Sequence, residues 1–144
     1  MNKKILFAVL VLCLSLVSCS TFQGEQSAET HNNRGTGYFD IGNFEKAISE
    51  WNRAIEIDPQ YADAYVNRGD AYLAKGEFDQ ALADFDKAIT INPNDAYAYL
   101  FRGMCLIDIG ENQRAIPDLE RALELDLHPV DQELARELLD EASQ

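Results

Sequence analysis

The sequence predicts an all-α fold, a solenoid of three helix-turn-helix units that is closed by a C-terminal capping helix. Three observations support this prediction. Small residues recur every 34 positions, bulky apolar residues recur in phase with them, and glycine or proline stands where the helices are expected to end. With 144 residues, 47% of them hydrophobic, the chain is long enough for one domain with a shared core.

Glycine recurs in the middle of the first helix of each unit, at Gly35, Gly69 and Gly103. A glycine inside a helix costs about 1 kcal/mol relative to alanine, so its recurrence predicts that a second helix axis comes close. The second helix supplies alanines as the matching small surface, and a larger side chain one turn further on fills the space beside them. These positions are Ala47, Ala81 and Ala115, then Ala54, Ala88 and Ala122, and the larger Trp51, Phe85 and Leu119.

A second glycine series marks the expected end of each first helix, at Gly42, Gly76 and Gly110. Glycine suits the left-handed residue that stops a helix. Pro59 and Pro93 follow the second helices of the first two units, and they predict the boundary between one unit and the next.

Taken together, these residues resemble the tetratricopeptide repeat (TPR), a helix-turn-helix unit of 34 residues. The resemblance implies TPR units over residues 28–61, 62–95 and 96–129, the last with a degenerate end, and a capping helix over 130–144. The second unit matches the pattern best, with Tyr65, Gly69, Tyr72, Ala81, Phe85, Ala88 and Pro93.

Four residues stand out against this pattern. His31 takes a place where the family has an aromatic residue, and we expect His31 and His128 to be surface or turn residues. Pro117 falls within the last second helix and is expected to kink that helix or to delay its start. Pro129 arrives late, so we expect an altered last turn in the third unit. Beyond it, one apolar stripe predicts the buried face of the capping helix: Leu134, Ala135, Leu138, Leu139 and Ala142.

The N-terminal segment has the features of a lipoprotein signal peptide over residues 1–18. Two lysines precede an apolar run that is short for a membrane-spanning helix. The run ends in Leu-Val-Ser-Cys at positions 16–19, which resembles the bacterial lipobox and implies cleavage before Cys19 and lipidation of that residue. Residues 19–27 are then a polar tether. The alternative is an ordinary secretory signal with an incidental cysteine.

The lipobox resemblance also implies a location. The chain is expected to be lipid-anchored in the bacterial cell envelope, and Ser20 after the cysteine implies passage to the outer membrane in a host that has one. Once Cys19 is modified, Cys105 is the remaining thiol, and we expect it to be a small buried hydrophobic residue.

Composition and motifs argue against several classes of function. The formal net charge of −13 disfavours binding to nucleic acids and adsorption to anionic lipid headgroups. The sequence has no glycine-rich phosphate loop, no histidine or cysteine set with metal-ligand spacing, and no nucleophile motif. We therefore expect no enzymatic activity, no metal ion and no cofactor.

The family resemblance implies that the first helices line an inner groove that holds a partner protein or peptide. We expect an extended or helical peptide with apolar anchors and a basic residue near Asp70 or Asp108. The predicted partner-binding residues are Asn32, Thr36, Phe39 and Asp40 in the first unit, Val66, Asp70 and Leu73 in the second, and Tyr97, Leu100, Met104, Ile107 and Asp108 in the third. The alternative is that the final helix covers Leu100, Met104 and Ile107, which would make them core residues.

Some family members grip the C-terminal carboxylate of chaperones with lysine, arginine and asparagine side chains. Asn67 fits one of those positions, but Tyr97 and Phe101 stand where the cations are needed. The resemblance therefore disfavours this specialised kind of binding here.

The sequence thus predicts a non-catalytic protein-interaction adaptor that is anchored by lipid to the bacterial envelope. The alternative is a structural subunit of an outer-membrane assembly machine, of the kind that serves pilus assembly, secretin assembly or outer-membrane protein insertion.

Overall fold

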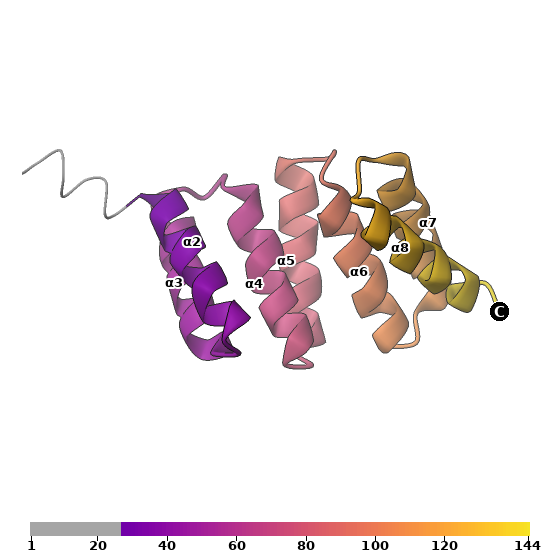
Figure 1. Ribbon diagram of the computed structural model, residues 1–144, viewed down its shortest axis with the longest axis horizontal. Coiled ribbons are helices and arrows are strands. Elements are labelled where there is room, and N and C mark those ends of the chain that lie inside the picture. The colour runs from indigo at the N-terminus through magenta and orange to yellow at the C-terminus, as the bar shows by residue number, and fades with distance from the viewer. Residues whose placement is uncertain (1–26) are drawn as a thin grey trace, which may run out of the picture.

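The computed structural model describes residues 27–144, and these residues contain seven α-helices and no strand. The helices follow one another along the long axis of the molecule (Figure 1). The all-α prediction is confirmed, whereas the predicted signal peptide, Cys19 and most of the tether lie outside the described residues. The helices are α2 (Ala28–Asp40), α3 (Phe44–Ile57), α4 (Ala62–Ala74), α5 (Phe78–Ile91), α6 (Ala96–Asp108), α7 (Asn112–Glu124) and α8 (Pro129–Ala142).

Local capping interactions and glycine turns define where these helices begin and end. The Ser27 hydroxyl accepts a hydrogen bond from the backbone N–H of Thr30 at 3.1 Å and caps α2. The turns that follow α2, α4 and α6 contain Gly42, Gly76 and Gly110, whose φ angles are +74°, +73° and +79°. These values confirm the predicted left-handed residues, because side chains other than hydrogen are strained there.

Each helix pair packs through the predicted mid-helix glycine. A Cβ atom placed on Gly69 would lie 2.6 Å from Cε1 of Phe85, which is fully buried. The same contact joins Gly35 to Trp51 and Gly103 to Leu119, at 2.5 and 2.8 Å. The close approach is confirmed, but the nearest neighbour of each glycine is the bulky side chain and not an alanine.

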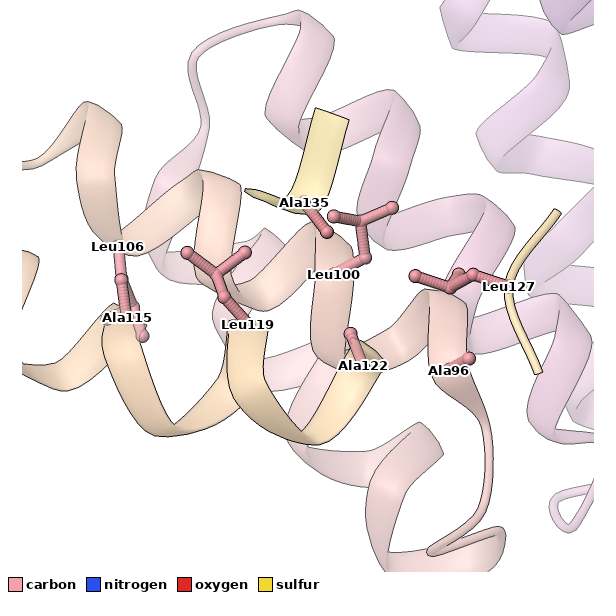
Figure 2. Packing of buried hydrophobic residues seen from close by; sticks show 8 residues of the cluster. All are labelled: Ala96, Leu100, Leu106, Ala115, Leu119, Ala122, Leu127 and Ala135. Atoms are coloured by element: carbon pink, nitrogen blue, oxygen red, sulfur yellow. The ribbon is translucent and has the colours of Figure 1, made fainter. Parts of the chain in front are cut away.

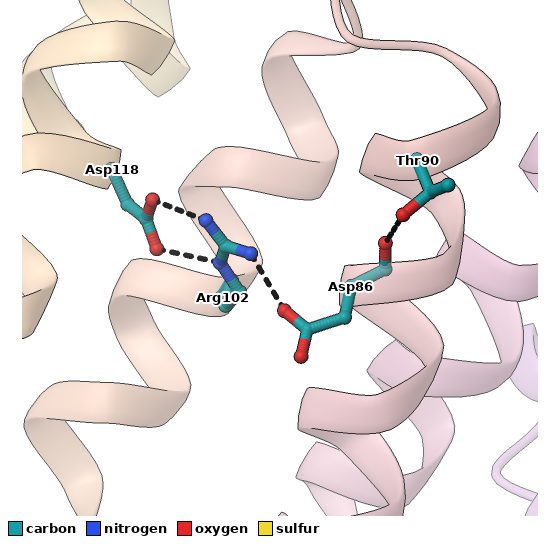
Figure 3. Close-up of polar contacts among 4 residues, drawn as sticks. All are labelled: Asp86, Thr90, Arg102 and Asp118. Atoms are coloured by element: carbon teal, nitrogen blue, oxygen red, sulfur yellow. Dashed lines mark hydrogen bonds and ion pairs between the residues drawn. The ribbon is translucent and has the colours of Figure 1, made fainter.

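Arginine side chains tie each unit to the one before it. The Arg102 guanidinium on α6 donates two hydrogen bonds to Asp118 on α7, at 2.7 and 2.6 Å, and a third to Asp86 on α5 at 2.6 Å (Figure 3). Arg68 on α4 repeats the arrangement with Asp84 and Asn52. Each arginine thus joins a first helix to the second helix of its own unit and to the second helix of the unit before.

The third unit and α8 share one hydrophobic core. Leu100 of α6, Leu119 of α7 and Ala135 of α8 lie together in this cluster (Figure 2). The last turn of the third unit is altered as expected, since α7 ends at Glu124 and Leu127 is buried. The predicted apolar stripe on α8 is only partly buried, because Leu134 is exposed to solvent.

One sequence-based expectation is wrong, and of the two alternatives for Pro117 the delayed helix start is excluded. Helix α7 starts at Asn112, in phase with Phe78 and Phe44, and continues through Pro117, so the proline does not delay the start of the helix. His31 is buried, and its Nδ1 atom lies 2.6 Å from Oε2 of Glu50. His31 is in phase with Tyr65 and Tyr99 of the later units. Its side chain faces α3, which carries Glu50, and not the solvent.

Candidate functional site

One pocket lies across the first helices of the three units. Its volume is about 400 Å³, which is in the range of sites that hold small ligands or single side chains. Most of its walls come from α4 and the start of α6, and α2 contributes one residue. The lining residues are Asn32, Asp63, Val66, Asn67, Asp70, Asp95, Tyr97 and Phe101.

An asparagine pair joins the first two units at this pocket. Asn67 Nδ2 donates to Oδ1 of Asn32 at 2.9 Å, and the backbone carbonyl of Asn32 accepts a hydrogen bond from the Trp51 indole at 3.2 Å. Asn32 is buried, so both its side chain and its carbonyl are fixed by partners. The pocket wall between α2 and α4 is therefore held in one arrangement.

Three carboxylates line the pocket, and no lysine or arginine lines it. Burial raises the pKa of Asp70, and no hydrogen bond or ion pair to its carboxylate is found within residues 27–144. Burial also raises the pKa of Asp95. The carboxylate accepts hydrogen bonds from the backbone N–H groups of Ala98 and Tyr97, which lower this pKa by a smaller amount. The nearby charge of Asp63 also raises this pKa. The pocket is a region of negative charge without an internal counter-charge.

Aromatic rings form the wall on the α6 side. The rings of Tyr97 and Phe101 are tilted, with centroids 6.1 Å apart. The Tyr97 hydroxyl donates to Oδ2 of Asp131 on α8 at 2.9 Å, and this hydrogen bond raises the pKa of Tyr97. The capping helix therefore fixes the orientation of one of the two rings.

Comparison with known protein families agrees with this architecture. A profile described as "TPR repeat" matches residues 35–76, and profiles described as "Tetratricopeptide repeat" match residues 62–95 and 96–129. A solved repeat domain of 31% sequence identity is covered over 99% of its length. The chain belongs to the tetratricopeptide repeat family. A sequence search against curated proteins finds no significant match.

Several solved TPR structures resemble this chain. The first TPR of Spaghetti (RPAP3), bound to the HSP90 peptide SRMEEVD, has a TM-score of 0.77 and 28% identity over 83% of this chain and 93% of that one. The second TPR of Spaghetti, bound to the same peptide, has a TM-score of 0.68 and 31% identity over 74% and 99%. The TPR2B domain of yeast Sti1, in complex with an Hsp70 peptide, has a TM-score of 0.75 and 28% identity over 81% and 96%.

The TPR pocket brings together one third of the partner-binding residues predicted from the sequence. Asn32, Val66, Asp70 and Tyr97 all line it. Of these, Asn32 and Val66 are themselves buried, so they contribute only a small part of the accessible surface. Asp70 and Tyr97 are the predicted residues that the pocket leaves most accessible.

Other predicted groove residues lie elsewhere. Leu100 is 1% exposed and packs in the cluster that contains Ala135 of α8, so it is a core residue, and the alternative interpretation holds for it. Met104 and Ile107 pack against the same cluster while partly buried, as Phe39 and Leu73 do against the cores of their own units. The predicted stripe of groove residues on each first helix is wrong at these positions, because they face a neighbouring helix. Thr36, Asp40 and Asp108 are exposed outside the pocket.

The groove prediction omitted four residues that line the pocket: Asp63, Asn67, Asp95 and Phe101. The 34-residue repeat could have indicated three of them. Asp63 is in phase with Tyr97, which was predicted, and Asn67 is in phase with Phe101. Helix α6 places one member of each pair opposite its counterpart on α4. Asp95 shows no such signal, since its visible role is to cap α6.

Residues 27–144 also contain side chains of the metal-ligating kinds and one thiol outside the pocket. They contain no group of three or more histidine, cysteine, aspartate or glutamate side chains that could hold a metal ion. Burial raises the pKa of Cys105 to about 11, so its thiol is protonated near neutral pH. Within the same residues, no helix has both the length and the hydropathy that crossing a membrane requires.

Proposed function

We propose that this protein is a non-catalytic adaptor that is tethered by lipid at Cys19 to the bacterial cell envelope. It binds a segment of another protein on the surface formed by its first helices. The observation that carries this proposal is the open pocket of about 400 Å³ across α2, α4 and α6. The TPR domains of Spaghetti and Sti1 that resemble this chain were solved with peptides bound, which supports the same kind of ligand here.

Site-specific photo-crosslinking in cells tests the binding surface. A photoreactive residue at Asp63, which is exposed at the pocket, should form a covalent adduct with a partner protein. The same residue at Arg53, which is exposed on α3, is the matched control and should form no such adduct. Equal adducts from both positions would argue against a specific surface.

The composition of the captured complex separates the adaptor from the structural subunit. An adaptor should co-purify from detergent-solubilised membranes with one or a few substoichiometric partners. A stoichiometric complex of many subunits would instead assign the chain to an outer-membrane assembly machine.

The proposed anchor is tested by labelling cells with a palmitate analogue. The chain should take up the label and sediment with the membrane fraction, and the Cys19→Ser variant should lose both properties. Cys13→Ser is the control that should keep them, because Cys13 lies within the predicted signal peptide. Label on the Cys19→Ser variant would contradict lipidation at that residue.

A further inference from the structure

We infer that the pocket receives an arginine side chain of the partner, so that the bound segment of the partner is basic. This inference rests on the proposed function, because it names the chemistry of the ligand that binds the same surface. The pocket is more than a group of carboxylates, since Val66 and two aromatic rings form part of its wall.

Charge complementarity is the first argument. Asp63, Asp70 and Asp95 line the pocket, and none of them forms an ion pair within residues 27–144. A half-buried carboxylate without a counter-charge is unfavourable in the free protein, and a cation that enters removes that penalty. The formal net charge of −13 further attracts a basic segment from a distance.

The protein's own arginines provide the second argument. Arg68 pairs with Asp84 and lies 5.6 Å from the centroid of the Tyr65 ring. Arg102 pairs with Asp118 and lies 5.7 Å from the ring of Tyr99. In both units a guanidinium thus lies between a carboxylate and a tyrosine ring.

The pocket offers the same two kinds of group without the cation. Asp70 and Asp95 supply carboxylates, while Tyr97 and Phe101 supply ring faces or edges at one wall. A planar guanidinium can stack on a ring while it donates to a carboxylate, which a lysine ammonium cannot do equally well. Arginine is therefore the better fit of the two basic side chains.

The similar solved structures point to the opposite charge. The peptide SRMEEVD bound to the Spaghetti domains carries one arginine against two glutamates and a terminal aspartate, so acidic side chains predominate in it. Three carboxylates on this pocket repel such a peptide. Shared architecture therefore does not carry the acidic ligand over to this chain.

The test uses the full-length chain in detergent micelles and a phage-displayed library of random peptides. Peptides that are selected should share an arginine at one position. Replacing that arginine by glutamine, or Asp70 by asparagine in the protein, should each weaken binding of the synthetic peptide about tenfold. If the two groups touch, the combined change should weaken it little further.

Asp79→Asn is the matched control, because Asp79 is an exposed carboxylate on α5, a second helix, outside the pocket. Its effect on binding should stay within about twofold, as screened surface charges contribute little. The peptide SQMEEVD, in which glutamine replaces the arginine of SRMEEVD, should not bind detectably.

The outcomes of this test separate the arginine inference from the proposed adaptor function. Selected peptides without arginine, additive effects of the two changes, or binding of the arginine-free SQMEEVD would overturn the arginine inference and leave the proposed adaptor function standing. Recovery of no binding peptide would contradict both.

Discussion

Two regions of this molecule contain buried or half-buried aspartates. The aspartates are paired with arginine in one region and have no cation partner within residues 27–144 in the other. Between the helix pairs, the side chains of Asp84 and Asp118 are 7% and 8% exposed, and each accepts two hydrogen bonds from an arginine. In the pocket, Asp70 is half-buried and meets no cation. The interior is also filled, whereas the pocket is open.

This difference separates residues that hold the fold from residues that are available to a ligand. A paired and buried carboxylate becomes costly only when its partner is removed. An unpaired carboxylate lowers the stability of the free protein, and its removal is expected to raise it. Stability and binding should therefore respond in opposite ways in the two regions.

The largest effect is expected from removing the counter-charge in the interior. Arg102→Gln leaves Asp118 buried without a cation, and it should lower the free energy of unfolding by about 2–3 kcal/mol. Urea titration followed by circular dichroism measures this value. The control is Arg114→Gln, whose partner Glu111 is an exposed residue of the same turn, and its effect should stay below about 0.5 kcal/mol. Equal effects would remove the distinction between buried and exposed pairs.

A smaller effect is expected from filling space in the interior. In Gly69→Ala the new methyl group lies 2.6 Å from the buried Phe85 ring, and the overlap should lower stability by about 1 kcal/mol even after the gain in helix propensity. Thermal unfolding measures the change. Gly37→Ala is the control on α2, where nothing lies within 4 Å, and it should raise stability by about 0.5–1 kcal/mol. A stabilised Gly69→Ala variant would contradict the packing described here.

The smallest effect, and one of opposite sign, is expected in the pocket. Asp70→Asn should raise the free energy of unfolding near neutral pH by about 0.5 kcal/mol, because it removes an unpaired charge. Burial raises the pKa of Asp70 above its ordinary value of 3.8, so the folded state takes up its proton more readily than the unfolded state. The penalty is present above the raised pKa and disappears as the pH falls toward the ordinary value.

The difference between the variant and the wild type should therefore shrink on acidification. Urea titrations of both proteins at neutral pH and at a pH near the ordinary value for aspartate measure it. A variant that is less stable than the wild type at neutral pH would show that Asp70 supports the fold.

Much of the architecture could be predicted because the repeat makes packing local. Gly69 contacts Phe85 within one unit, and the same pair of positions recurs twice, so the pattern predicts which helices pack together even though it placed alanine against the glycine. His31 was misjudged from its polar character, although its position is in phase with Tyr65 and Tyr99. The late helix start expected from Pro117 is wrong because a helix that packs along its length tolerates a proline that would break an isolated one.

The binding surface could be predicted only in part. The helical stripe contains positions that face solvent and positions that face the next helix, and Asp70 and Leu100 fall on different sides of that division. Spacing along one helix cannot separate the two kinds, because the separation depends on where the neighbouring helices lie.

By itself the sequence determined the helices, their ends and the partners within each pair, since these follow from backbone preferences and from contacts at short separation along the chain. The tertiary structure alone decided which carboxylates are paired and which face open space. It also decided that α8 covers Leu100 while its Asp131 holds Tyr97 at the pocket. The reason is physical: a pocket is a volume left between side chains of several helices, and no single segment of the chain contains it.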